Sequence, residues 1–130
     1  MEHFIAESTK STPLVDFNAE SRMLMIKGQS YPENSFKFYE PILQWVDDFF
    51  AMDRDSRLIS LEVSLPYINT SSSKCILMLL EKLEEAKGNG KNIVVNWYYD
   101  QDNVSEMECA QDFKEFVELE FNLIAIQAFL

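Results

Sequence analysis

Four consecutive hydroxyl side chains, Thr70–Ser73, are the strongest candidates for chemistry in this sequence. They follow an expected strand and begin an expected helix, which places them at the carboxyl end of a sheet, where open α/β sheets bind their partners. The unpaired N–H groups and the dipole of a helix N-terminus also favour a phosphate. The residues alone favour a Ser/Thr-rich helix cap, and a phosphorylation site is the alternative.

Other catalytic devices are scarce. His3 is the only histidine, and the chain has neither a glycine-rich nucleotide motif nor a Cys/His cluster with metal-ligand spacing. Cys75 and Cys109 are interpreted as free thiols of a reducing compartment. We therefore expect no catalytic residue, no cofactor and no metal. A small enzyme that uses some of the many carboxylates is a minor alternative.

Length and charge narrow the class of partner. The 130 residues predict a single domain over 1–130, and the net charge of −11 argues against nucleic acid and against an anionic membrane surface. The longest apolar run, Cys75–Leu80, is far shorter than the roughly 20 residues that span a bilayer, and no signal peptide opens the chain. A cytoplasmic protein that binds other proteins or small molecules is expected.

The elements that position the hydroxyl run alternate between strand and helix. The predicted fold is α/β, a mixed sheet with an N-terminal hairpin at one edge and about three helices packed on it. The first helix is expected to start near Tyr39, which puts Pro41 in its first turn; the alternative is a longer helix that is kinked at Pro41. Strands are predicted over 14–17, 22–27, 57–65, 92–99 and 123–129, and further helices from the hydroxyl run to about Lys87 and over 105–119.

The helix after the hydroxyl run has two distinct faces. Its core face is predicted to hold Ile76, Leu79, Leu80, Leu83 and Ala86. Ser71, Lys74 and Met78 fall on the opposite side, where an exposed methionine is either part of a docking face or a singly exposed apolar residue. In the last helix, the residues predicted to face inward are Met107, Ala110, Phe113, Phe116 and Val117.

Five short segments carry a resemblance to a known family. They are Ser11-Thr12-Pro13, Gly28-Gln29-Ser30-Tyr31-Pro32-Glu33-Asn34-Ser35, Tyr67-Ile68-Asn69-Thr70-Ser71-Ser72-Ser73-Lys74, Leu80–Ala86 and Val95-Asn96-Trp97-Tyr98-Tyr99-Asp100. In their order and spacing, the chain resembles the SiaC-like family of bacterial regulatory phosphoproteins. The Tyr-Pro-Glu-Asn-Ser and Asn-Thr-Ser-Ser-x-Lys motifs are the most specific of these.

The resemblance implies a fold like the STAS domains of anti-sigma factor antagonists, and a role in partner switching. A cognate protein kinase would phosphorylate Thr70, and a PP2C-type phosphatase would remove the phosphate. The unphosphorylated form would bind and activate a partner, in this family a diguanylate cyclase that controls cyclic-di-GMP and biofilm formation. The Asp-Ser-[Ser/Thr]-Gly pattern of the antagonists is absent, which marks a divergent branch.

Two points of this interpretation concern the partner surface. The alternative function is an antagonist-type STAS module that binds an anti-sigma kinase or another signalling enzyme. The partner-binding residues are expected to be Asn69, Thr70, Ser71, Ser72, Lys74 and Met78 on one segment, and Tyr31, Glu33 and Asn34 on the other.

Overall fold

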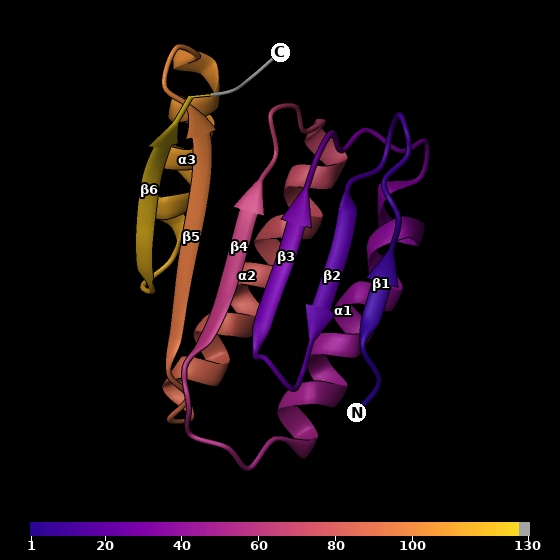
Figure 1. Ribbon diagram of the computed structural model, residues 1–130, viewed down its shortest axis with the longest axis vertical. Helices are drawn as coiled ribbons and strands as arrows, with labels where there is room; N and C mark the ends of the chain where they lie inside the picture. The colour runs from indigo at the N-terminus through magenta and orange to yellow at the C-terminus, as the bar shows by residue number, and fades with distance from the viewer. Residues whose placement is uncertain (128–130) are drawn as a thin grey trace.

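A six-stranded mixed sheet forms the centre of the computed structural model, which describes residues 1–127. The strands follow chain order across the sheet, and the first two pairings are antiparallel while the last three are parallel (Figure 1). The strands are β1 Phe4–Ala6, β2 Leu14–Asn18, β3 Met23–Lys27, β4 Ile59–Ser64, β5 Ile93–Asp100 and β6 Glu120–Ile126. The helices are α1 Ser35–Met52, α2 Thr70–Gly88 and α3 Val104–Phe116. The mixed sheet with three helices, as in STAS domains, is confirmed.

All three helices cover the same face of the sheet (Figure 1). Each helix connects a strand to the next parallel strand in the same direction, and right-handed crossovers that advance in one direction stay on one face. The core lies between this face and the helices, so inward residues alternate along each strand. In β4, for example, Ile59, Leu61 and Val63 are buried. The carboxyl ends of the parallel strands and the starts of α1 and α2 therefore meet at one edge.

The first helix begins earlier than the sequence predicts. It starts at Ser35 rather than near Tyr39, so Pro41 lies inside the helix and not in its first turn. A proline removes the hydrogen bond to the carbonyl group four residues back, here that of Lys37. Both Pro41 and Lys37 are exposed, so water can solvate the released carbonyl group. The expectation was wrong because it treated proline as a start signal, whereas Asn34 caps the helix.

The two edges of the sheet also differ from expectation. The predicted hairpin forms from β2 and β3, but β1 pairs outside it and is the true edge strand. At the other edge α3 ends at Phe116, not at Leu119, and β6 begins at Glu120 rather than Leu123. The last predicted strand residues, 128 and 129, lie outside the described residues.

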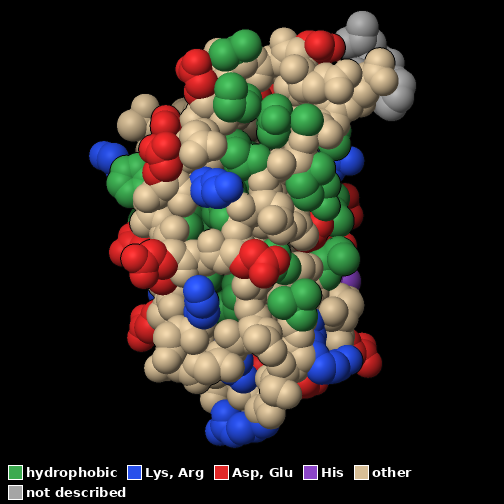
Figure 2. Space-filling view, turned by 90° about the vertical axis from the view of Figure 1, so that its left-hand side faces the viewer, with side chains coloured by type: hydrophobic (Ala, Val, Ile, Leu, Met, Phe, Trp, Pro, Cys, Tyr) green, Lys and Arg blue, Asp and Glu red, His purple; other side chains and the backbone are tan. Residues whose placement is uncertain are grey.

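Part of the predicted inner face of α3 is wrong, and the helix ends earlier than predicted. Ala110 and Phe113 are buried, but Phe116 is 70% exposed, and Met107 and Val117 are only half-buried. Figure 2 shows apolar side chains gathered on the side of the molecule that β6 and α3 form. Val104, Phe116 and Ile126 are exposed members of these two elements.

An ion pair closes the end of the sheet at which the parallel strands begin. Arg22, in the β2–β3 turn, has a positive φ of 64° and is buried. It donates to both carboxylate oxygens of Asp53, at 2.7 and 2.9 Å, and its Nε donates to the Arg57 carbonyl group. Lys91 Nζ donates to Asp53 at 2.6 Å. The Arg22 guanidinium group holds the pKa of Asp53 well below its usual range.

This arrangement predicts that Asp53→Ala destabilises the protein by about 3–5 kcal/mol at pH 7, because Arg22 is left buried without its counter-ion. The contribution of Asp53 is present above its ordinary pKa of 3.8 and is lost as pH falls toward its lowered folded-state pKa. The difference between wild type and variant should therefore shrink below about pH 4. Urea unfolding at pH 7 and pH 3 measures both quantities.

Asp47→Ala is the matched control for this prediction. Asp47 lies on α1, the helix that Asp53 follows directly, and pairs with Lys82 at 2.8 Å, but its side chain is 50% exposed, against 7% for Asp53. An exposed pair contributes no more than about 1 kcal/mol. Equal losses for the two variants would contradict the structural role assigned to the Arg22–Asp53 pair.

Candidate functional site

The hydroxyl run lies where α2 begins, at the carboxyl edge of the sheet. Asn69 is the N-cap residue, and its side-chain oxygen accepts a hydrogen bond from the Ser72 N–H at 2.9 Å. This cap releases Thr70 from any capping role and makes it the first residue of the helix. The Thr70 side chain is exposed. Neither α1 nor α2 has an acidic residue in its first turn, so no carboxylate there would oppose an added phosphate.

A second segment, Ser30–Ser35, lies directly against this turn. Ser30 N donates to Tyr67 O, and Asn69 N donates to Ser30 O, both at 2.9 Å, so the two segments pair like short parallel strands. The rings of Tyr31 and Tyr67 meet edge to face, with centroids 5.6 Å apart. The two segments that carry the expected partner-binding residues therefore form one continuous surface at the upper edge in Figure 1.

A buried chain of hydroxyl groups joins the two segments beneath this surface. Tyr39 Oη lies 2.7 Å from Ser30 Oγ, and Ser30 donates to Ser72 Oγ at 2.9 Å. Ser35 Oγ then lies 3.1 Å from Ser72 Oγ and 2.7 Å from Ser71 Oγ. Burial raises the pKa of Tyr39 to about 12, so its phenol keeps its proton. Ser30 donates its single hydrogen to Ser72, so every buried hydroxyl group has both a donor and an acceptor only if donation runs in one direction. That direction is from Tyr39 to Ser30, then to Ser72, Ser35 and Ser71.

The chain makes the four hydroxyl groups of the run unequal. Thr70 is exposed, and within residues 1–127 its hydroxyl group makes no hydrogen bond. Ser71 is exposed but bonded to Ser35, whereas Ser72 is fully buried and Ser73 is half-buried. Thr70 is thus the one hydroxyl group of the run that is exposed and makes no hydrogen bond within residues 1–127.

The outer face of α2 is arranged as the sequence predicts. Ser71, Lys74 and Met78 are exposed, and Met78 is 38% accessible. The predicted core face, Ile76, Leu79, Leu80, Leu83 and Ala86, is buried.

At the start of α1, Glu33 and Asn34 are exposed, and the Asn34 side chain accepts from Lys37 N at 3.0 Å. Asn34 and Asn69 thus act as helix caps; the polar run 69–73 predicts such a cap for α2, whereas the cap of α1 was not predicted. Whether these residues contact a partner stays a prediction.

Sequence reasoning missed the residues that support the turn from below. Ser30, Ser35 and Tyr39 are buried, and Tyr67 contributes the second ring of the aromatic pair. Ser30 and Ser35 are part of a quoted motif, but a buried serine has no periodic signature and the motif alone does not reveal which residue it contacts. The one available signal was Tyr39, a polar-tipped ring on an otherwise apolar helix face, whose hydroxyl group needs a partner.

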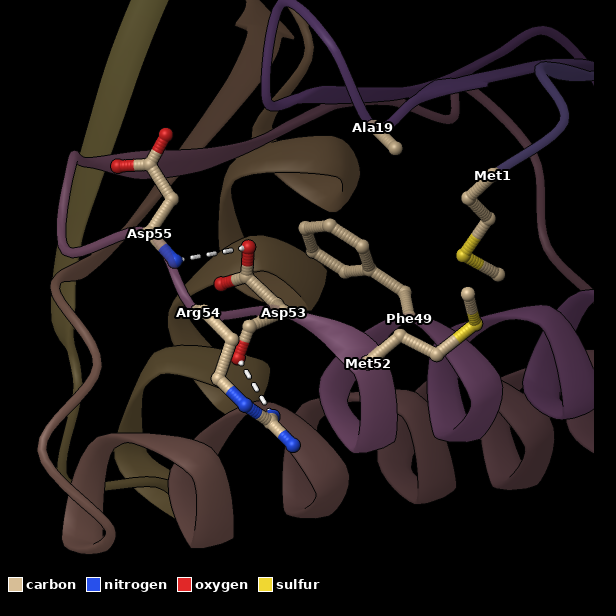
Figure 3. Close-up of a pocket in the computed structure, with 7 residues that line it drawn as sticks. All are labelled: Met1, Ala19, Phe49, Met52, Asp53, Arg54 and Asp55. Atoms are coloured by element: carbon tan, nitrogen blue, oxygen red, sulfur yellow. Dashed lines mark hydrogen bonds between the residues drawn. The ribbon is translucent and has the colours of Figure 1, made fainter.

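The opposite end of α1 holds a depression of about 570 Å³. Met1 and Met52 line one side, Asp53–Asp55 the other, and Phe49 lies between them (Figure 3). The carboxylate of Asp53 is already paired with Arg22 and Lys91. Because α1 starts at the hydroxyl run and ends here, this depression is remote from Thr70.

Metal and membrane sites find no support in the described part of the chain. Residues 1–127 contain no group of three or more His, Cys, Asp or Glu side chains that could hold a metal ion. Cys75 and Cys109 are free thiols, and burial raises the pKa of both. No helix within this range is long and apolar enough to cross a bilayer.

Comparisons with known proteins converge on one family. The family model of the SiaC family regulatory phosphoproteins matches residues 6–126. An uncharacterized protein of Pseudomonas aeruginosa (strain UCBPP-PA14) is 37% identical over 120 residues, which cover 92% of this chain and 91% of the relative.

Two solved structures from Pseudomonas aeruginosa are also similar. The crystal structure of apo-SiaC matches with a TM-score of 0.88 at 34% identity, over 96% of this chain and all of that one. A chain in the crystal structure of the diguanylate cyclase SiaD in complex with its activator SiaC matches with a TM-score of 0.88 at 33% identity, over 95% of this chain and 99% of that one. With a family match that spans most of its length, the chain belongs to the SiaC family of regulatory phosphoproteins.

Proposed function

We propose that this chain, acting over residues 1–130 as one domain, is a phosphorylation-controlled activator of a diguanylate cyclase. Its unphosphorylated form binds the cyclase, and phosphorylation of Thr70 ends the binding. The observation that carries the proposal is the exposed hydroxyl group of Thr70 at the start of α2, which makes no hydrogen bond within residues 1–127, in a chain whose fold matches an activator found with a cyclase.

The proposed partners follow from this cycle. A cognate protein kinase adds the phosphate, and a PP2C-type phosphatase removes it. The chain itself acts by binding and not by catalysis. We propose that it works in the cytoplasm, because the kinase draws on ATP and the cyclase on GTP.

Local electrostatics support a switch that acts on the surface and leaves the fold intact. A phosphate adds about −1.5 to −2 charges at pH 7. On Thr70 these charges lie at the N-terminus of α2, which stabilises an anion, and one turn away from the exposed Lys74. The same charges would be buried without a counter-ion in an interface that fits a neutral hydroxyl group, and this cost opposes binding.

The proposal predicts that Thr70→Ala abolishes phosphorylation. The protein is purified from its native cell with phosphatases inhibited, and its intact mass and peptides are analysed. Wild type should carry one phosphate on Thr70, and the variant none. Ser73→Ala is the matched control from the same helix turn and should keep the phosphate. A phosphate retained by the Thr70→Ala chain would show that the assignment of the site is wrong.

Phosphorylation should change stability by no more than about 1 kcal/mol, because the added charge lies at a favourable helix end. Urea unfolding of the phosphorylated form and of the same sample after phosphatase treatment measures the difference. Their far-ultraviolet circular dichroism spectra should coincide. A large loss of helical signal in the phosphorylated form would mean that the phosphate acts by disrupting the fold.

The docking surface is tested by Met78→Asp, which should weaken cyclase binding at least about tenfold, because it places an unpaired charge in the interface. Met23→Asp is the control, since Met23 has a similar exposure of 43% on the sheet face that carries no helix. Binding is measured by titration against the cyclase after circular dichroism confirms folding.

Two further variants complete this test. Thr70→Glu should weaken binding like Met78→Asp, whereas Leu79→Asp should unfold the protein because Leu79 is buried in the core. Wild-type affinity of a folded Met78→Asp chain would place the docking face elsewhere.

A further inference from the structure

We propose that Ser35 determines which hydroxyl group of the run is phosphorylated, and that Ser71 is a latent second phosphorylation site that Ser35 keeps closed. The inference rests on the proposed phosphorylation of Thr70 and goes further by assigning the selectivity to a residue on a different helix. Ser35 acts as a positioning residue, since its contact is with the substrate hydroxyl group of Ser71 and not with the kinase.

The contact between the two serines joins the first turns of two helices. Ser35 Oγ lies 2.7 Å from Ser71 Oγ, at the short end of the hydrogen-bond range. Ser35 is only 2% exposed with Ser71 in place, so Ser71 is the group that satisfies its hydroxyl and covers it. In the donor order of the buried chain, Ser35 accepts a hydrogen bond from Ser72 and donates one to Ser71.

If Ser71 turned outward, the Ser35 hydroxyl group would lose its hydrogen-bond acceptor. The next acceptor within reach of the Ser35 hydroxyl group is Asn69 Oδ1 at 3.4 Å, a long contact whose oxygen already accepts from Ser72 N. A buried hydroxyl group without a good acceptor is destabilising. Thr70 carries no such penalty, because its hydroxyl group leaves no partner behind.

The transfer reaction makes this difference matter. A kinase aligns the hydroxyl oxygen with the γ-phosphorus of ATP, the new O–P bond forms, and the bond between that phosphorus and the β–γ bridging oxygen breaks. ADP leaves, and the hydroxyl proton passes to a base of the kinase. The oxygen must be free to turn toward the nucleotide, which Thr70 is and Ser71 is not.

Removal of the Ser35 hydroxyl group should therefore open Ser71. Wild type, Ser35→Ala and Ser30→Ala are purified from the native cell with phosphatases inhibited, and their phosphorylated peptides are mapped. Phosphate on Ser71 should rise about tenfold in Ser35→Ala, the factor that one lost hydrogen bond allows. Ser30→Ala is the matched control, since it breaks the same buried chain but leaves the Ser35–Ser71 contact intact.

A second pair of variants adds a test in which one member, Thr70→Ala, keeps Ser35 intact. In Thr70→Ala, where Ser35 is intact, Ser71 should remain unphosphorylated although the preferred site is gone. In Thr70→Ala/Ser35→Ala the chain should regain one phosphate, on Ser71. Circular dichroism of each chain confirms that it is folded.

The outcomes separate this inference from the proposed function. Phosphate on Thr70 of wild type, with none on Ser71 in a folded Ser35→Ala chain, overturns the role of Ser35 and leaves the proposed function intact. Phosphate on Ser71 of wild type, Ser30→Ala or Thr70→Ala to the same extent as in Ser35→Ala also overturns it. A wild-type chain without phosphate on the run overturns both.

Discussion

The bidentate pair between Arg22 and Asp53 fixes the end of the sheet on which the rest of the structure depends. It joins the β2–β3 turn to the connection between α1 and β4, and Lys91 adds the start of β5. Arg22 also holds a left-handed backbone conformation, which costs about 1–3 kcal/mol at a residue other than glycine. Ionic hydrogen bonds to a carboxylate that is itself shielded from water offset this strain. Three connections are thereby held to one carboxylate, so the register of the parallel strands is fixed from their starting ends.

The first helix transmits this constraint to the functional edge. It begins at Ser35, beside the hydroxyl run, and ends next to Asp53, about 27 Å away for 18 residues at 1.5 Å each. One end is held by charged groups and the other by a chain of neutral hydroxyl groups. The difference suits the proposed function, because a neutral network adds no fixed charge next to Thr70, the residue that we propose is phosphorylated. The surface around Thr70 is thus held by groups that do not compete with a phosphate.

Much of this arrangement could be predicted from the residues. Alternation in Leu58–Leu65 and the β-branched run Ile93–Val95 gave the central strands, and the spacing of Ile76, Leu79 and Leu83 gave the buried face of α2. These signals are periodic and come from burial, which dominates local preference. The motif around Thr70 indicated where α2 begins, because Asn69 is a strong N-cap residue.

The errors have physical causes at particular residues. Asn34 caps α1 seven residues before Pro41. Because Pro41 is exposed, water can solvate the carbonyl group that lacks its helical hydrogen bond, and the helix continues through the proline. The expected start was therefore too late. Phe116 looks like a core residue in a helical pattern, but the helix ends there and the ring points outward. The β1 strand spans three residues, too few for a periodic pattern. The pairing of Ser35 with Ser71 joins residues 36 positions apart, and no local rule reveals such a contact.

The order of strands across the sheet has a consequence for how the chain is made. Each strand pairs with the one before it in sequence, so a chain leaving the ribosome can extend the sheet strand by strand, as domains do when they fold from their N-terminus during synthesis. Every member of the buried hydroxyl chain precedes residue 73. The support for the Thr70 turn is therefore synthesised before β5, α3 and β6, and a nascent chain exposes the proposed phosphorylation site before its last edge strand exists.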